Sequence, residues 1–228
     1  MSKHVVISGA NRGLGLGFVK SYLASGDRVT ALVRDIGAAS ELKALQSEHE
    51  SLSLLACDMS ELGGIADLAP KIEGPIDLLI NNAGVYGGSA QSLGEIDAAT
   101  WQETFTVNTM APYFLTQALL PLMAKPSRLA FVSSKMGSIA DNGSGGAYIY
   151  RSAKAALNAV VKSLANDLSA RGISVVVLHP GWVKTRMGGP NGLIEVDESV
   201  NGMTAVISRL DASQSGKFIN FDGTEIPW

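Results

Sequence analysis

Two tyrosines and one lysine lie close together in the segment AYIYRSAKAALN, residues 147–158, and these residue types can move a proton. A tyrosine phenol has a pKa of about 10 in water and is therefore a poor base at neutral pH. A lysine four residues further along a helix lies on the same face, and its charge can lower the pKa of the phenol by about 1–3 units. Lys154 stands in that relation to Tyr150, whereas the residue four positions after Tyr148 is Ser152. The spacing therefore predicts that Tyr150, and not Tyr148, transfers a proton.

The composition argues against several classes of protein. The chain has 228 residues, of which 46% are hydrophobic and 17% charged, so it can bury a sizeable core. Its formal net charge is −3 and its basic residues are scattered, so we expect no nucleic-acid partner. Cys57 is the single cysteine and the three histidines show no metal-binding spacing, so we expect neither a disulfide nor a metal. No segment is apolar enough for a signal peptide or a membrane span, and we expect a cytoplasmic protein with no membrane partner.

Near-continuous apolar runs alternate with helical segments along the chain. Strands are expected at 5–8, 29–33, 52–56, 76–80, 128–133 and 174–178, and a seventh at 217–220. Helices are expected at 14–24, 38–48, 61–71, 101–123 and 150–169. Pro112 predicts that the fourth of these helices bends or restarts near Asn108. This alternation indicates one α/β domain over residues 1–228, a Rossmann-type doubly wound parallel sheet of about seven strands with helices on both faces.

Glycines and small polar residues follow the expected strands, at the edge where such sheets bind their ligands. The first strand runs into SGANRGLG (8–15), whose glycines would let the backbone approach a pyrophosphate at a helix N-terminus. Asp58 follows the third strand and NNAG (81–84) follows the fourth. Each feature has a plainer interpretation, namely a glycine turn, a helix N-cap at Asp58 and a simple turn at 81–82. Their joint occurrence at matching strand ends favours a dinucleotide site.

These segments, in this order, resemble the classical short-chain dehydrogenase/reductase family. The resembling stretches cover nearly the whole chain: SGANRGLG (8–15), CDM (57–59), NNAG (81–84), VNTMAP around Asn108, VSS (132–134), YRSAK (150–154) and HPGWVKT (179–185). The tail GKFINFDGTEIPW further resembles the branch of C-factor-like signalling proteins and sniffer-like carbonyl reductases. The resemblance implies an NADPH-dependent carbonyl reductase that converts a small aldehyde or ketone to an alcohol by hydride transfer, with Tyr150 as proton donor. The alternative is a dinucleotide-binding signalling or regulatory protein, although a matched Ser134, Tyr150 and Lys154 argues for turnover.

The resemblance also implies roles for individual residues. Ser134 would hydrogen-bond the substrate carbonyl, although Ser133 also ends the strand and only one of the two can face the site. Asn108 would hold a water for proton relay, or would only cap a broken helix. Lys154 would also bind the nicotinamide ribose. The residues implied to contact the cofactor are Gly9, Asn11, Arg12, Gly13, Leu14, Gly15, Arg34, Asp58, Met59, Asn82, Ala83, Gly84, Tyr150, Lys154, Pro180, Gly181, Val183 and Thr185.

The residues after the second expected strand bear on the choice between NADP and NAD. Asp35 lies 20 residues after Gly15, where an acid would bind the ribose 2′-hydroxyl of NAD. Arg34 follows Val33 directly and Arg12 lies in the glycine loop, so two guanidiniums could bind the 2′-phosphate of NADP. Asp35 would then cap the next helix. We therefore expect NADP as the cofactor, with NAD less favoured.

The surroundings of the site give further expectations. The stretch from Ser134 to Tyr150 is longer than the family pattern, which implies a flexible loop at DNGSGG (141–146). Tyr148 is either an aromatic wall of the cleft or a packed residue. The short segment MGGPNGLIEVDES (187–199) is where the family covers its substrate, and its shortness suggests an open cleft. The family usually pairs through its two long helices, so we expect a homodimer or homotetramer, with the second helix offering the small residues Ala155, Ala156 and Ala159.

Phenylalanine substitutions of the two tyrosines test the spacing argument. Tyr150→Phe removes only the hydroxyl, so steady-state NADPH oxidation should slow by on the order of 10²–10⁴-fold while NADPH binding changes modestly. Lys154→Ala should be as severe or worse. Tyr148→Phe should leave turnover within a small factor, because no cation lies four residues beyond it. Loss of turnover in Tyr148→Phe but not in Tyr150→Phe would show that the spacing argument is wrong.

Overall fold

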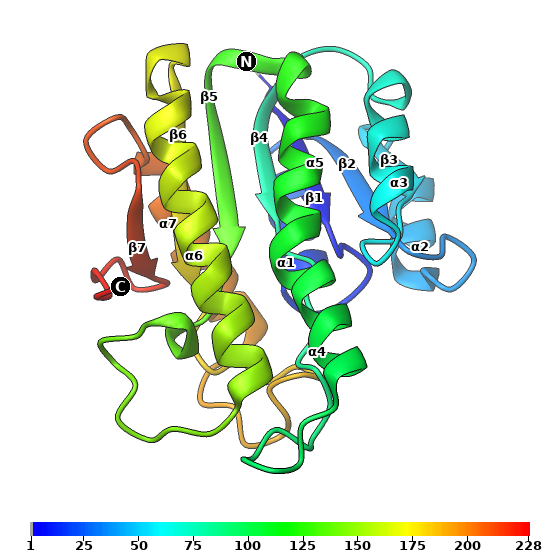
Figure 1. Cartoon of the computed structure of the whole chain (residues 1–228). Helices are drawn as coiled ribbons and strands as arrows, with labels where there is room; N and C mark the ends of the chain where they lie inside the picture. Colours follow the sequence, from blue (N-terminus) through cyan, green and yellow to red (C-terminus); the bar gives the residue numbers. More distant parts are fainter. Residues whose placement is uncertain (1) are drawn as a thin grey trace.

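Seven parallel strands form one continuous sheet in the computed structural model, which describes residues 2–228 (Figure 1). The strands are β1 (His4–Ser8), β2 (Arg28–Val33), β3 (Leu52–Ala56), β4 (Ile76–Asn81), β5 (Met123–Val132), β6 (Ile173–His179) and β7 (Lys217–Asn220). Their order is β3-β2-β1-β4-β5-β6-β7. In the centre of the sheet, Val6 of β1 pairs with Thr30 of β2 on one side and with Leu79 of β4 on the other. The strand order reverses at β1 and β4, so a crevice is expected outside their carboxyl ends.

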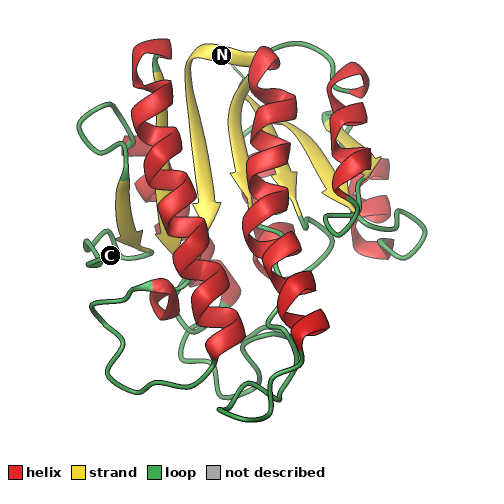
Figure 2. Ribbon diagram, viewed as in Figure 1, coloured by secondary structure: helices red, strands yellow, loops and turns green. Residues whose placement is uncertain are grey.

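Helices cover both faces of this sheet (Figure 2). One face is covered by α1 (Gly13–Ala24), α2 (Ser40–Glu48) and α7 (Val196–Arg209). The other is covered by α3 (Leu62–Ile65) with η1 (Ala66–Lys71), α4 (Ala98–Phe105), α5 (Ala111–Leu119) and α6 (Tyr148–Leu168). Because both faces are covered, all five residues of β1 are buried, which explains why the strands are apolar without alternation. No helix within residues 2–228 combines the length and the apolar character that crossing a membrane would require.

The doubly wound sheet predicted from the sequence is confirmed, with one helix added. α7 lies in the crossover from β6 to β7. No helix was expected there from the sequence, and residues 187–199 were expected to form the segment that covers the substrate. The helix buries Val200, Met203 and Ile207 against α1 and the sheet. Their spacing follows the helical period, so the signal was present in the sequence.

The long helix expected at 101–123 is interrupted where Pro112 predicted it. Between α4 and α5 lies a π turn, η2 (Thr106–Met110), in which the Ala111 N–H donates to the Thr106 carbonyl. Pro112 has no N–H, so the α-helical hydrogen bond to the carbonyl of Asn108 cannot form. The helix ends earlier than expected, at η3 (Leu120–Leu122), and β5 begins at Met123.

Candidate active site

The glycine loop after β1 lies directly against the loop after β4. Gly9 has φ +64°, and a Cβ there would lie 2.8 Å from the Cα of Ala83. The Asn82 side chain donates to the carbonyls of Ser8 and Gly9, at 3.0 and 3.1 Å. The Ser8 hydroxyl in turn accepts from the backbone N–H groups of Asn82 and Ala83. Asn82 therefore holds the two loops together, and glycine is required where they touch.

Gly84 links these loops to two further residues that the sequence singled out. A Cβ on Gly84 would lie 3.2 Å from Asn108 Oδ1 and 3.6 Å from Lys154 Nζ. Asn108 is fully buried, and both ends of its amide bind the backbone of Val85: Oδ1 accepts from the N–H and Nδ2 donates to the carbonyl, each at 2.8 Å. The side chain is thus committed to the loop after β4. Pro112 removes the α-helical partner of the Asn108 backbone carbonyl, because proline has no N–H.

Of the two serines at the end of β5, Ser134 is the one that meets Tyr150. The Ser134 hydroxyl lies close enough to the Tyr150 phenol to act on its pKa, and Ser134 Oγ accepts a hydrogen bond from the backbone N–H of Met136 at 3.2 Å. Ser133 points the other way, and its hydroxyl donates to Asn158 Oδ1 of α6 at 2.8 Å. The alternation of side chains along the strand therefore resolves the choice in favour of Ser134.

Tyr150 and Lys154 share one face of α6, and burial dominates the titration of both. Lys154 Nζ lies 5.9 Å from the centre of the Tyr150 ring and donates to the Val132 carbonyl at 3.0 Å. Burial raises the pKa of Tyr150 to about 12, although the nearby Ser134 hydroxyl works in the opposite direction. Burial also lowers the pKa of Lys154 to about 8. The expectation that Lys154 lowers the pKa of Tyr150 is therefore not met in this structure, because burial is the largest influence on the phenol and Lys154 is not among the groups that shift its pKa.

The start of α6 is held by Gln91, a residue that sequence reasoning missed. The backbone N–H of Tyr150 donates to Gln91 Oε1 at 2.9 Å, and Gln91 Nε2 donates to the carbonyls of Tyr86 and Gly88. The Tyr86 ring packs against the Tyr150 ring, with 4.8 Å between their centres. Tyr148, the first residue of α6, is 40% exposed, so it is not a packed core residue.

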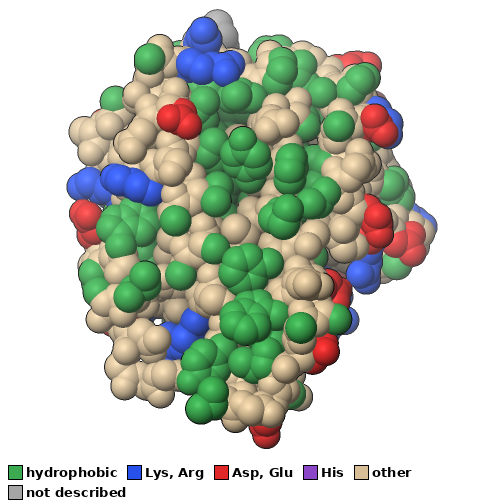
Figure 3. Space-filling view, viewed as in Figure 1, with side chains coloured by type: hydrophobic (Ala, Val, Ile, Leu, Met, Phe, Trp, Pro, Cys, Tyr) green, Lys and Arg blue, Asp and Glu red, His purple; other side chains and the backbone are tan. Residues whose placement is uncertain are grey.

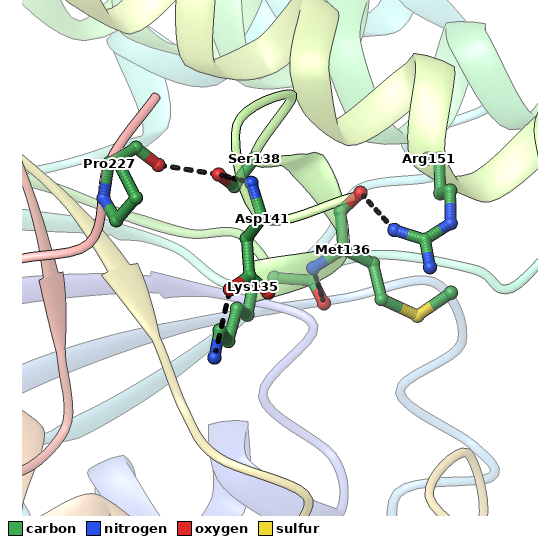
Figure 4. Close-up of polar contacts among 7 residues, drawn as sticks. Lys135, Met136, Ser138, Asp141, Arg151 and Pro227 are labelled. Atoms are coloured by element: carbon green, nitrogen blue, oxygen red, sulfur yellow. Dashed lines mark hydrogen bonds and ion pairs between the residues drawn. The ribbon is translucent and has the colours of Figure 1, made fainter. Parts of the chain in front are cut away.

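The segment between Ser134 and α6 is fixed at several points (Figure 4). Arg151 donates to the Met136 carbonyl at 3.3 Å and to the Ser144 hydroxyl at 2.8 Å. The Ser138 hydroxyl donates to the carbonyl of Pro227 at 2.6 Å, close to an ion pair of Lys135 with Asp141. The expected insertion at 141–146 is exposed, but Arg151 ties it to the helix that carries Tyr150.

Three arginines converge beside the glycine loop. The pKa of Arg12 is lowered by burial and by the positive charges of Arg186 and Arg34. Arg34 also helps to lower the pKa of Asp58, together with two hydrogen bonds from Ser60 that outweigh the effect of burial. None of the three arginines forms an ion pair within the described part of the chain. Arg186 was not predicted, although it directly follows a residue of the resembling segment 179–185.

Two acidic residues have plainer surroundings than the sequence suggested. Asp35 accepts a hydrogen bond from the N–H of Gly37 at 2.7 Å and so closes a turn, whereas α2 begins later, at Ser40. Asp58 closes a similar turn with Ser60. The expectation that either carboxylate caps the next helix is wrong, because each bonds the N–H two residues on and the chain makes a turn before the helix starts.

The remaining predicted residues reach the same edge of the sheet in different ways. Thr185 lies beside the glycine loop, 3.4 Å from where a Cβ on Gly13 would be. Gly181 has φ +82° and packs against Ile194. The side chains of Met59 and Val183 are buried, and that of Leu14 is partly buried against the core. Asn11 is partly exposed, and the Pro180 carbonyl accepts a hydrogen bond from the Ser199 hydroxyl.

Comparison with known proteins agrees with this arrangement. The family model described as short chain dehydrogenase matches residues 3–193. C-signal from Myxococcus xanthus is 48% identical over 157 residues, covering 68% of this chain and 94% of that protein. The structure of carbonyl reductase Sniffer of D. melanogaster matches with a TM-score of 0.95 and 34% identity over the full length of both chains. An NADPH-bound carbonyl reductase from chicken fatty liver matches with a TM-score of 0.93 and 36% identity, over 100% of this chain and 99% of that one.

The pKa of about 8 for Lys154 predicts a pH dependence. Because burial disfavours the ammonium, Lys154 loses its charge as the pH rises through about 8, whereas Tyr150, with a pKa of about 12, stays protonated. kcat/KM for NADPH reports groups of the free protein and should therefore fall across that interval. Lys154→Arg should remove this fall, because a guanidinium does not deprotonate there. Lys162→Arg on the same helix is the control, and a fall that survives in Lys154→Arg would assign the titration to another group.

Proposed function

The chain belongs to the short-chain dehydrogenase family and is an oxidoreductase, and from this premise we propose that it is an NADPH-dependent reductase of aldehydes or ketones. The observation that carries the proposal is the Ser134 hydroxyl beside the Tyr150 phenol, with Lys154 one helical turn further on. Two hydroxyls at one point can together bind a carbonyl oxygen and give it a proton.

The roles of the residues follow from this geometry. Bound NADPH would supply the hydride. Met136 donates to Ser134 Oγ, so the Ser134 O–H is available to bond the substrate oxygen. Tyr150, kept in its protonated form by burial, delivers the proton to that oxygen. The ammonium of Lys154 then stabilises the phenolate until a proton relayed by water held at Asn108 restores the phenol.

The three arginines support NADPH over NADH. Arg12, Arg34 and Arg186 bring three positive charges together with no ion-pair partner among residues 2–228, and a 2′-phosphate would neutralise them. The glycine loop leads into the N-terminus of α1, where free backbone N–H groups can bind a pyrophosphate. The similar reductase from chicken fatty liver is described as NADPH-bound, which points the same way.

The loops around Tyr150 favour an apolar substrate. Most of the exposed large hydrophobic side chains in the described residues lie on loops at the carboxyl edge of the sheet or at the start of α6. They are Tyr86, Leu93, Ile139, Tyr148, Trp182, Met187 and Leu193. The charged residues nearest Ser134 are engaged, Lys135 with Asp141 and Arg151 with the loop. We therefore propose aromatic or long aliphatic carbonyls as the preferred substrates.

A signalling role is the second candidate, because the 48%-identical relative is named C-signal. A protein that only bound a dinucleotide would have no need of a serine, a tyrosine and a lysine in catalytic register. The two roles predict different results with the same reagents, since a pure signalling protein would bind NADPH without consuming it.

An assay of NADPH consumption tests the proposal. We expect the purified protein to oxidise NADPH with aromatic aldehydes and diketones, faster than with small charged carbonyls such as pyruvate. NADPH should be preferred to NADH. Tight NADPH binding with no oxidation across a broad panel would favour the signalling role.

Arginine variants provide the control for cofactor choice. Arg34→Ala and Arg186→Ala should each raise the KM for NADPH about 10–100-fold, the equivalent of a charge-assisted hydrogen bond of about 1.5–3 kcal/mol. The KM for NADH should change little, because NADH lacks the phosphate. Arg209→Ala, at the end of α7, is the matched surface control. Equal losses for both cofactors, or a wild type that prefers NADH, would show that Asp35 governs the site.

An apolar face across α4, α5 and α6 supports self-association. Trp101, Met110 and Tyr113 are exposed there, and Figure 3 shows hydrophobic side chains gathered over these helices. Trp101, Phe105 and Met110 line an open hollow of about 330 Å³. The Trp101 indole donates to Ser152, which fixes α4 against α6 and makes one surface of the two. We propose that two copies pair through this face.

Light scattering checks the assembly. We expect the mass of a homodimer or homotetramer at micromolar concentration. Met110→Asp should lower the mass, because a carboxylate would be buried without a partner. Ser208→Asp, an exposed position on α7 on the opposite side of the sheet, should leave the mass unchanged. A monomeric wild type would contradict the proposal.

A further inference from the structure

Ser134 opens a tight turn that lies against the middle of α6. It is the N-cap of η4 (Lys135–Gly137), and the Gly137 N–H donates back to its carbonyl at 2.8 Å. A Cβ on Gly137 would lie 2.8 Å from the backbone carbonyl carbon of Lys154, so the turn fits only with glycine there. The position of the Ser134 hydroxyl therefore depends on how this turn is held against the helix.

One buried amide bonds the chain on both sides of Ser134. Asn158 is only 3% exposed and lies one helical turn beyond Lys154 on α6. Its Oδ1 accepts from the hydroxyl of Ser133 at 2.8 Å, and its Nδ2 donates to the carbonyl of Gly137 at 3.3 Å. Ser133 immediately precedes the turn and Gly137 closes it, so both ends are fixed to the helix that carries Tyr150.

We propose that Asn158 is a positioning residue for Ser134: by bridging Ser133 and Gly137 it sets the Ser134 hydroxyl against Tyr150. Its own contacts are with Ser133 and Gly137 rather than with the reacting hydroxyls, so it acts through the turn. The kinetic consequences of this inference rest on the proposed function. The position of the Ser134 hydroxyl does not, because it can be determined without turnover.

The chemistry of the side chain fits this task. An amide offers one acceptor and one pair of donors, which match a hydroxyl donor and a carbonyl acceptor. Aspartate would keep the bond from Ser133 but would face the Gly137 carbonyl with a second acceptor. Leucine has a similar volume but would leave both Ser133 and Gly137 without a partner in a buried place, which favours a shift of the turn.

The alignment of Ser134 matters because its hydroxyl, close to Tyr150, opposes the effect of burial on the tyrosine. A displaced serine would lose this influence and would no longer offer a second donor to the substrate oxygen. Misplacement of a catalytic group by about 1 Å can cost on the order of 10²-fold in rate. The dinucleotide contacts of the glycine loop and the arginine cluster lie elsewhere and should not feel the change.

Kinetics of matched variants test the proposal. Asn158→Leu should lower kcat about 10–100-fold with the Kd for NADPH within a small factor of wild type. Ser133→Ala should lower kcat less, since the contact with Gly137 remains. The double variant should be no slower than Asn158→Leu alone, because both substitutions act on one turn. Leu168→Ala, a buried residue at the end of α6, controls for lost stability and should keep kcat.

Several outcomes would overturn the inference. If Asn158→Leu keeps wild-type kcat, or loses no more than Leu168→Ala at equal stability, Asn158 does not position Ser134. A wild type without turnover contradicts the proposed function instead, and crystal structures then decide this inference. In the structure of Asn158→Leu, Ser134 Oγ must lie at a different distance from the Tyr150 hydroxyl than in the wild type, and an unchanged distance would refute the proposal.

Discussion

The burial of the Lys154 ammonium is the constraint on which the rest of the site depends. The residue is 4% exposed, and within residues 2–228 its ammonium has only the Val132 carbonyl as a hydrogen-bond partner, so its charge is held at a cost that shows as a lowered pKa. The bond ties α6 to the end of β5, just before the two serines. Gly84 and Gly137 both border this lysine, one at Nζ and the other at the backbone, because larger residues would force the strands and the helix apart.

Neutral amide side chains hold the other segments of the site together by hydrogen bonds. Asn82, Asn108 and Asn158 bond groups that are far from them in the chain, and Gln91 joins its own loop to the distant N–H of Tyr150. None of the four carries a charge that would compete with Lys154 or with an anionic ligand. An amide can donate and accept at once, so it can join two segments of backbone without leaving a polar group unsatisfied. The catalytic candidates are thus held by groups whose own ionisation does not change with pH.

The sequence predicted the parts of this site that depend on local spacing. Tyr150 and Lys154 lie on one helical face because four residues make about one turn, and the strands were recognisable because both faces of the sheet are covered. The partners of Asn82 and Asn158 lie 74 and 25 residues away, a distance that no periodicity encodes. Arg186 was overlooked for a similar reason, since only the folded chain brings it to Arg12. The pKa of Tyr150 was misjudged because desolvation is a property of the packed site.

The π turn at Thr106–Met110 gives the helix of α4 and α5 one residue more than an even α-helical winding would use. That extra residue sets the rotation of α4 about the helix axis relative to α5. A deletion of a single residue here could leave both helices intact and still rotate Asn108 by about 100° away from Val85, since each residue turns an α-helix by that angle. The number of residues in this helix, and not only their types, therefore helps to hold the loop after β4 in place. An insertion or deletion between α4 and α5 would act on the site as strongly as a substitution of a site residue.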